Sequence, residues 1–126
     1  MVGRAKKPTS DRRSSCPLSC SLDIIGDKWT LLIVRDLFVG KTAFKDFLDS
    51  PEGIATNVLS ERLIRLLNNG LVEKYHPTDT GRREHYRLTK RGQGLMSIIK
   101  PIVKWGSNEL PRTRITGPYR KLQKAR

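Results

Sequence analysis

The sequence predicts a mainly α-helical domain that carries one β-hairpin, and three observations support this fold class. Within residues 53–72, GIATNVLSERLIRLLNNGLV, leucines recur at helical spacing and Asn-Asn-Gly marks the end of an amphipathic helix. The spacing of apolar residues then changes, so that 71–76 and 84–88 are predicted as two strands joined by a turn at 77–83. Helical spacing returns between residues 89 and 105.

Three shorter helices are predicted before the long one. They span residues 16–25, 28–38 and 43–48. Gly26 stops the first and Gly40 closes the second, the role that glycine commonly has after the end of a helix. Ser-Pro-Glu-Gly at residues 50–53 predicts a turn before the long helix.

The last helix is expected to begin after Thr89, whose hydroxyl can cap it, and to be kinked or broken at Pro101. The resulting order is helix, helix, short helix, long helix, hairpin, helix. This is the order of a winged helix-turn-helix, in which a three-helix core presents its last helix to the DNA major groove and the hairpin reaches the flanking backbone.

The charge of the chain is concentrated at its two ends. The 126 residues carry a formal net charge of +13, of which +4 lies in residues 1–15 and +6 in residues 112–126. We therefore expect a folded domain over residues 16–111 between a flexible basic N-terminal arm and a flexible basic C-terminal tail. Such a charge favours a polyanionic partner, most simply nucleic acid, although basic tails also occur on proteins that do not bind it.

Several classes of protein are excluded. The longest aliphatic run, residues 31–34, ends at Arg35, whereas a membrane span needs about 20 apolar residues. The N-terminus has the charge of a signal peptide without its apolar stretch, so we expect a cytoplasmic protein without a membrane partner. The sequence contains no phosphate-binding loop, dinucleotide fingerprint or nucleophile with a nearby base, which predicts neither an enzyme nor a cofactor.

The polar side of the long helix is the best candidate for reading DNA. Its members can donate hydrogen bonds to base edges or phosphates: Thr56, Asn57, Ser60, Arg62 and Arg65. We expect the first three to face the groove, and the two arginines to turn toward phosphate or toward acidic residues of the protein itself. The alternative is a merely solvated helix face.

The hairpin supplies a second candidate DNA contact. Its basic residues are Lys74, Arg82, Arg83 and Arg87. Residues 74–91 carry a net +4, which suits contact with phosphate or the minor groove. A solvated hairpin without such a role is the alternative.

Cys16 and Cys20 are candidate sensor thiols. Their spacing puts them on one side of a helix, and Arg12 and Arg13 upstream would favour the reactive thiolate. Alternatively, both are small half-buried residues at a dimer contact. A zinc site is not expected, because two thiols and two distant histidines do not make a four-ligand set.

Taken in order, CPLSC, IGDKW, LSERL with GLV, and LTKRG resemble the HxlR-type winged-helix transcriptional regulators, which are related to the MarR group. The resemblance covers about residues 16–106. It implies a sequence-specific DNA-binding regulator without catalytic activity, whose dimer is built from the N- and C-terminal helices. Cys16 matches the N-terminal cysteine with which several members sense oxidants, quinones or aldehydes.

One departure concerns the start of the long helix, where many members have Ser-Pro and this chain has Ala55-Thr56. Thr56 is expected to act as the cap instead. The predicted function is a homodimeric regulator, expected to be a repressor, that binds a palindromic operator in double-stranded DNA and responds through Cys16 or a small-molecule or electrophile effector. A non-specific nucleic-acid-binding protein and a protein-interaction module with basic tails remain as alternatives.

Overall fold

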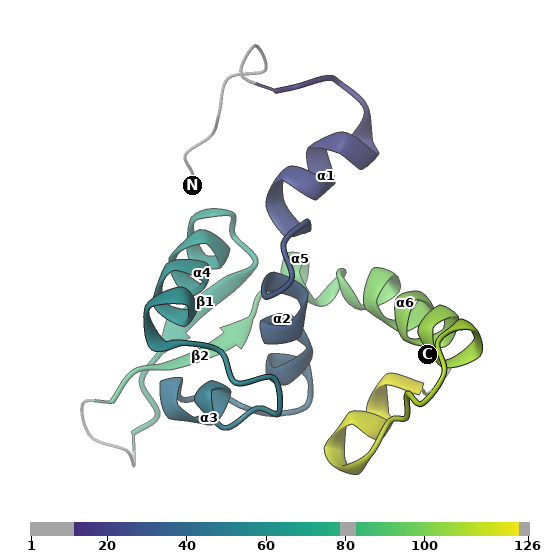
Figure 1. Cartoon of the computed structure of the whole chain (residues 1–126). Helices are drawn as coiled ribbons and strands as arrows, with labels where there is room; N and C mark the ends of the chain where they lie inside the picture. Colours follow the sequence, from purple (N-terminus) through teal and green to yellow (C-terminus); the bar gives the residue numbers. More distant parts are fainter. Residues whose placement is uncertain (1–11, 79–82, 124–126) are drawn as a thin grey trace.

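The computed structural model describes residues 12–78 and 83–123 (Figure 1). The elements in chain order are α1 (Pro17–Ile25), α2 (Thr30–Phe38), α3 (Phe44–Leu48), α4 (Thr56–Asn68), β1 (Val72–Tyr75), β2 (His85–Leu88), α5 (Lys90–Gln93), α6 (Met96–Glu109) and the 3-10 helix η2 (Gly117–Gln123). The predicted fold class, mainly helical with a two-stranded antiparallel hairpin, is confirmed. No helix in this part of the chain has both the length and the apolar character needed to cross a bilayer.

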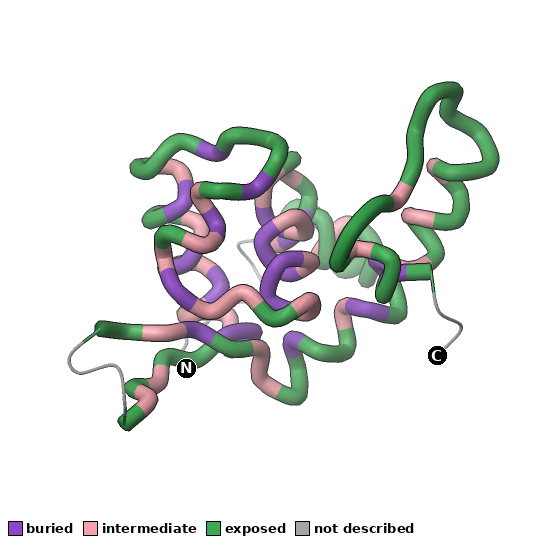
Figure 2. The backbone as a smooth tube through the Cα atoms, turned by 90° about the horizontal axis from the view of Figure 1, so that it is seen from below, coloured by how far each residue is buried: buried purple, intermediate pink, exposed green. Residues whose placement is uncertain are grey.

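The core forms where α2, α3, α4 and the hairpin meet. Val34, Phe47, Leu59 and Leu66 are its largest fully buried side chains. Leu59 and Leu66 lie two turns apart on one side of α4, as the sequence spacing requires. Figure 2 shows the buried residues gathered where the helices face one another.

The hairpin is held to the helical part of the molecule by its second strand. The two strands pair in register from Val72 opposite Leu88 to Tyr75 opposite His85. The backbone N–H of Tyr86 also donates to the carbonyl of Thr42 (2.8 Å), just before α3. The ring of Tyr86 meets Phe47 edge to face, with centroids 6.4 Å apart. The hairpin therefore has a fixed position relative to α3.

Short α5 packs tightly below the hairpin. The Thr89 hydroxyl accepts from the backbone N–H of Gly92 (3.0 Å), so the predicted cap is confirmed. Gly92 has no room for a side chain, because a Cβ there would overlap the carbonyl oxygen of Leu71 and press on Leu88.

Two details of the predicted helices are wrong. The helix expected to run from residue 89 to 105 is divided at Gly94 and Leu95, between α5 and α6, whereas Pro101 lies inside α6. Pro101 is exposed and removes only one helical hydrogen bond, so the helix continues past it to Glu109. Thr56 is the first residue of α4 and not its cap, a position that Ala55 occupies without a side-chain hydrogen bond.

The C-terminal segment also differs from its prediction. Residues 112–126 are expected to form a flexible tail, yet residues 117–123 form η2, and Leu122 is 2% exposed. A basic composition therefore does not keep this segment away from the core, because Leu122 and Tyr119 pack against it. Residues 1–11 of the predicted arm and 124–126 of the tail lie outside the described residues.

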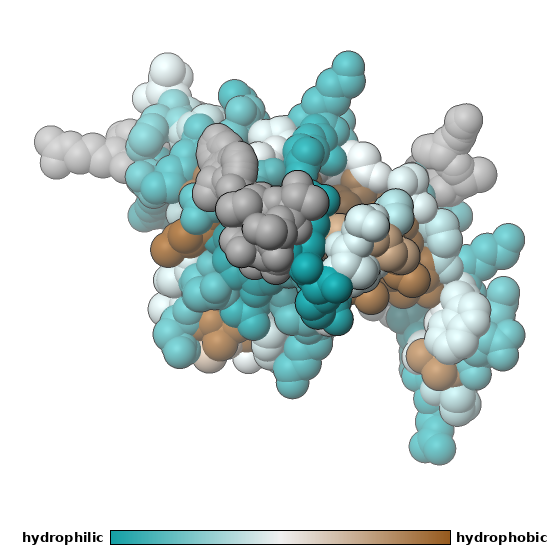
Figure 3. Space-filling view, turned by 90° about the horizontal axis from the view of Figure 1, so that it is seen from above, coloured by the Kyte–Doolittle hydropathy of each residue, from teal (hydrophilic) through white to brown (hydrophobic). Residues whose placement is uncertain are grey.

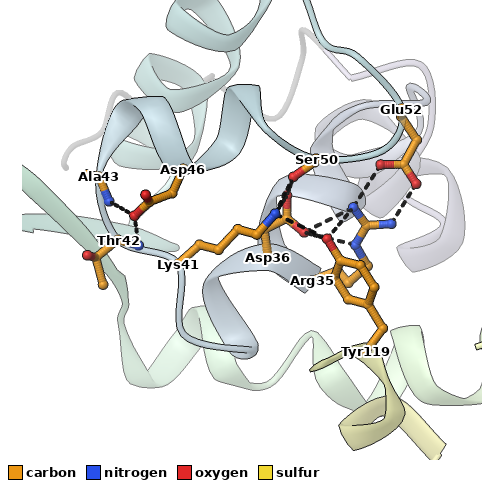
Figure 4. Close-up of polar contacts among 9 residues, drawn as sticks. All are labelled: Arg35, Asp36, Lys41, Thr42, Ala43, Asp46, Ser50, Glu52 and Tyr119. Carbon is orange, nitrogen blue, oxygen red and sulfur yellow. Dashed lines mark hydrogen bonds and ion pairs between the residues drawn. The ribbon is translucent and has the colours of Figure 1, made fainter. Parts of the chain in front are cut away.

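A polar cluster binds η2 to the core (Figure 4). The hydroxyl of Tyr119 donates to Oδ1 of Asp36 (2.9 Å), a carboxylate that is only 2% exposed. The other oxygen of Asp36 accepts from the hydroxyl of Ser50, and Nζ of Lys41 lies 3.8 Å from it. These donors compensate the buried charge of Asp36.

Arg35 completes this cluster. Its guanidinium donates two hydrogen bonds of 2.8 Å to Glu52 and a third of 3.1 Å to Asp36. The hydrogen bond from Arg35 lowers the pKa of Glu52, against the effect of burial. The ring of Tyr119 covers the guanidinium at 4.3 Å. Helix α2, the turn after α3 and the C-terminal segment are thus joined by one set of contacts.

Candidate nucleic-acid interface

Helix α4 presents an uncharged polar surface to solvent at its N-terminal end. Thr56, Asn57 and Ser60 are exposed, and none of their side chains has a hydrogen-bond partner among the described residues. They face outward because the leucines on the other side of the amphipathic helix are buried in the core. We call Thr56, Asn57 and Ser60 the reading face.

The two arginines predicted beside them turn toward acidic residues of the protein. Arg62 donates from Nε to Oδ1 of Asp27 (3.2 Å) and also pairs with Glu61. Arg65 lies 3.5 Å from the other oxygen of Asp27 and 4.0 Å from Glu61. The structure therefore separates the predicted set into a free reading face and two engaged arginines.

Asp27, which the sequence analysis did not select, holds this side of α4 in place. It lies in the turn that leads into α2, and its Oδ1 accepts from the backbone N–H groups of Trp29 (2.8 Å) and Thr30 (2.9 Å). Its Oδ2 accepts from the Thr30 hydroxyl (2.6 Å). Burial opposes ionisation, but the hydrogen bonds from Thr30, Trp29 and Arg62 outweigh it and hold the pKa of Asp27 well below its usual range.

Part of this arrangement could have been predicted. Aspartate three residues before a helical threonine is a pattern found at helix starts, where its oxygens satisfy free N–H groups. The pairing of Asp27 with Arg62, 35 residues further along the chain, leaves no such local pattern.

Arg65 also connects α4 to the end of α1. Its guanidinium donates to the backbone carbonyls of Asp23 (3.4 Å) and Ile24 (3.3 Å). These carbonyls lie in the last turn of α1, where a helix leaves acceptors unpaired. The helix that carries the cysteines is thereby bonded to the helix that carries the reading face.

The basic residues of the hairpin have different surroundings. Nζ of Lys74 lies 3.4 Å from Glu84, and Arg87 donates to Glu73 (2.8 Å) while its guanidinium covers the ring of Tyr75 (4.6 Å). Ion pairs this exposed are weak and can exchange for phosphate at small cost.

The end of the hairpin lies beside the start of α3. Arg83 is exposed and lines a shallow groove together with Phe44 and Lys45, whereas Arg82 lies outside the described residues. Helix α4 and this end of the hairpin are on the same side of the molecule, away from α6 (Figure 1). Lys45 is a basic residue of this region that the sequence analysis did not select.

The two candidate sensor thiols differ from each other. Cys16 is exposed and precedes the first residue of α1, where the backbone N–H groups of Ser19 and Leu18 lower the pKa of its thiol. Arg13, expected to have this effect, is instead bound to Asp23 (2.8 Å). Cys20 is half-buried, and its thiol donates to the carbonyl of Ser14 (3.3 Å).

No group of three or more histidine, cysteine or acidic side chains within residues 12–78 and 83–123 is arranged to hold a metal ion. Nδ1 of His85 is bonded to the hydroxyl of Thr42 (2.8 Å).

Comparison with known proteins identifies the family. The HxlR-like helix-turn-helix family matches residues 24–114, which include most of the core, the reading face and the hairpin. The chain belongs to the HxlR-like helix-turn-helix family.

Individual HxlR-like relatives agree with this assignment. An uncharacterized HTH-type transcriptional regulator of Mycobacterium tuberculosis is 37% identical over 103 residues, which are 82% of this chain and 63% of that protein. The chain thus spans less than two thirds of the length of this relative. Its description as a helix-turn-helix transcriptional regulator agrees with the class of protein predicted from the sequence.

Solved structures of similar proteins have the same fold. The crystal structure of PA1607, assigned as a transcription factor, has a TM-score of 0.75 and 38% identity, and the match covers 86% of this chain and 76% of that one. The redox regulator HypR in its oxidized form has a TM-score of 0.68 and 28% identity, covering 75% of this chain and 97% of that one. The winged helix-turn-helix predicted from the sequence is therefore the fold of this HxlR-like chain.

Proposed function

We propose that this HxlR-like regulator is a cytoplasmic homodimer that binds a palindromic operator in double-stranded DNA and represses the adjacent gene. The observation that carries the proposal is the reading face of α4, which is exposed, uncharged and without partners among the described residues. Its side chains can donate to and accept from base edges, and asparagine can form paired hydrogen bonds with adenine in the major groove.

The basic residues of the hairpin, together with Lys45, suit the DNA backbone. Arg82, Arg83, Lys74 and Arg87 belong to the hairpin, and Lys45 lies beside Arg83. Contacts with phosphate position a protein on the duplex without reading its sequence, and each adds to the salt dependence of binding. Arg62 and Arg65 support the interface in another way, by fixing α4 against Asp27 and α1.

Exposed apolar side chains support dimerisation through α1 and α6. These are Leu18 and Leu22 on α1, Ile98, Ile102 and Trp105 on α6, and Leu110 just after it. Leu18 is 66% and Trp105 61% exposed, which is unfavourable in a monomer. Figure 3 shows hydrophobic residues gathered in patches on one face of the molecule. A two-fold dimer would place two reading faces about 34 Å apart, one turn of DNA.

Cys16 is the proposed site of response to oxidants or electrophiles. Its exposure and its lowered pKa favour the thiolate, the form that reacts. The similarity to HypR, a redox regulator, agrees with this role. To test this, wild type and Cys16→Ser are treated with diamide or methylglyoxal. Mass spectrometry then measures modification of the cysteines, and a binding assay measures the affinity of each treated protein for DNA. An unmodified Cys16, or a full response of the variant, would assign control to a non-covalent effector instead.

Selection of bound fragments from a random DNA pool tests the main proposal. We expect one enriched sequence with two matching half-sites, and a preference for it over unrelated DNA of at least about 1,000-fold at physiological salt. Equal binding to every sequence would instead identify a non-specific nucleic-acid-binding protein. In a reporter strain, deletion of the regulator should raise expression from a promoter that carries the selected site.

A further inference from the structure

One large aliphatic side chain on α4 is not used by the core. Ile64 is 56% exposed. The other highly exposed leucines and isoleucines in the described part of the chain lie on α1, on α6 or directly after α6. Ile64 is therefore separated from the proposed dimer surface and lies on the helix that carries the reading face.

Helix geometry places Ile64 in line with the reading face. Asn57, Ser60 and Ile64 follow one another at intervals of three and four residues, which puts them on one side of an α-helix. Ile64 lies about 10 Å further along the axis than Asn57, equivalent to about three base pairs of DNA. A helix that inserts its first turn into the major groove therefore carries Ile64 along the same groove.

The charged residues next to Ile64 on α4 are engaged within the protein. Glu61, one turn before Ile64, pairs with Arg62 and Arg65. Arg62 and Arg65, on either side of Ile64 in the sequence, are directed toward Asp27 and the end of α1. The outward side of α4 thus continues from polar residues to an aliphatic one and not to a cation. An aliphatic side chain gains nothing from phosphate, but the C5 methyl group of thymine is an apolar partner in the major groove.

We propose that Ile64 is a specificity-determining residue that contacts the C5 methyl group of a thymine in each half-site. The proposal rests on the proposed function, because it requires α4 to lie in the major groove. Removing one methyl group from such a contact is expected to weaken binding about fourfold, and removing it from both half-sites about tenfold or slightly more.

Replacement of thymine by deoxyuridine tests this contact, because it deletes only the methyl group. The probe is the site enriched from the random pool, with each thymine replaced in turn in both half-sites. For wild type we expect about tenfold weaker binding at one symmetric pair of thymines and little change elsewhere. Ile64→Ala should bind the site with equal affinity whether that pair is thymine or deoxyuridine. Ile64→Leu should still prefer thymine.

Controls separate this contact from other roles of Ile64. Ile64→Ala should unfold at nearly the wild-type temperature and keep the wild-type mass in solution, because the side chain is largely exposed. Dissociation of the variant, or a loss of affinity far beyond tenfold, would assign Ile64 to a protein contact and overturn the proposal.

The outcomes also distinguish this proposal from the proposed function. The pool could yield a preferred sequence in which deoxyuridine weakens binding of wild type and Ile64→Ala equally, or of neither. That result would overturn the thymine contact alone. A pool that yields no preferred sequence would overturn the proposed function and the thymine contact together.

Discussion

Cys16 and Cys20 lie one helical turn apart, yet α1 gives their thiols opposite surroundings. The first faces unpaired N–H groups at the start of the helix, and the second donates to a backbone carbonyl. The sequence placed both on one side of a helix, and the family resemblance favoured Cys16, but neither predicted the difference in their surroundings. That difference depends on where the helix begins and on how the segment around Ser14 folds back.

We therefore predict that Cys16 reacts faster than Cys20 with iodoacetamide at neutral pH. Because the pKa of Cys16 is lowered, its rate should reach half of its maximum at a pH below the usual thiol range. Mass spectrometry of Cys16→Ser and Cys20→Ser over a series of pH values measures the two rates separately. Equal rates with the same pH midpoint would contradict this difference.

Asp27 supports a second prediction at the scale of the residue. Asp27→Asn should lower the free energy of unfolding at pH 7 by about 2 kcal/mol, since it removes a charged acceptor for Thr30 and Arg62. Because the pKa of Asp27 is lowered in the folded state, its contribution is complete above the ordinary carboxyl pKa of about 3.9 and is lost as the pH falls toward the folded value.

Urea denaturation of wild type and Asp27→Asn between pH 7 and pH 3 measures this contribution. The difference between the two proteins should stay constant down to about pH 4 and then narrow. A difference that widens on acidification would show that the carboxylate does not stabilise the fold. The comparison isolates Asp27, because Glu52, whose pKa is also lowered, is present in both proteins.

Helix α5 shows how a short element can depend on one glycine. The sequence predicts a helix after Thr89, but its break at Gly94 and the close approach at Gly92 follow from packing against the hairpin. Gly92→Ala should lower the free energy of unfolding by about 3 kcal/mol, because the added methyl group overlaps the carbonyl of Leu71.

Gly94→Ala is the matched control for this position. A Cβ at Gly94 meets only the carbonyl of Arg91, at 3.2 Å, in a backbone conformation that alanine adopts readily. Thermal and urea unfolding should therefore show a much smaller effect than for Gly92→Ala. Similar destabilisation by the two substitutions would mean that the approach of α5 to Leu71 is not the cause.

The C-terminal segment 117–123 is the element that sequence reasoning describes least well. Its basic composition predicts a tail, but two side chains, Tyr119 and Leu122, are enough to bind it to the core. Two partners of Tyr119, Arg35 and Asp36, lie 84 and 83 residues away in the sequence, so no local pattern indicates the contact.

Tyr119→Phe should lower the free energy of unfolding by about 1–2 kcal/mol, because it removes a donor from buried Asp36. Tyr75→Phe is the control and should change stability by less, because Tyr75 is half-buried and its hydroxyl has no hydrogen-bond partner among the described residues. Chemical denaturation of both variants checks the prediction. Full stability of Tyr119→Phe would show that η2 does not depend on the hydrogen bond to Asp36.

Across the whole molecule, the candidate sensor and the candidate interface belong to one connected structure. Cys16 directly precedes α1, the carbonyls of Asp23 and Ile24 near the end of α1 accept from Arg65, and Arg65 lies on α4. A displacement of α1 within a dimer would therefore act directly on the helix that carries the reading face. The sequence predicted both helices and selected Arg65, but it did not predict that Arg65 joins them.

The distribution of charged and polar residues could be predicted from the sequence, whereas most side-chain contacts could not. Ten of the thirteen net charges lie in the two terminal segments, and the uncharged reading face follows from helical periodicity alone. The sequence left open whether Arg62 and Arg65 turn toward phosphate or toward acidic residues of the protein, because their partner Asp27 comes beside α4 only in the folded chain.

The central claim is that uncharged residues of α4 provide selectivity, while the basic hairpin provides affinity that depends on salt. The most direct test measures the affinity of wild type, Asn57→Ala and Arg83→Ala for the selected site and for unrelated DNA over a series of salt concentrations. Asn57→Ala should reduce the preference for the selected site about tenfold or more at an unchanged salt slope. Arg83→Ala should weaken binding to both DNAs alike and reduce the slope by about 1. If Asn57→Ala changes neither the affinity for the selected site nor the preference for it over unrelated DNA, α4 is not the reading helix.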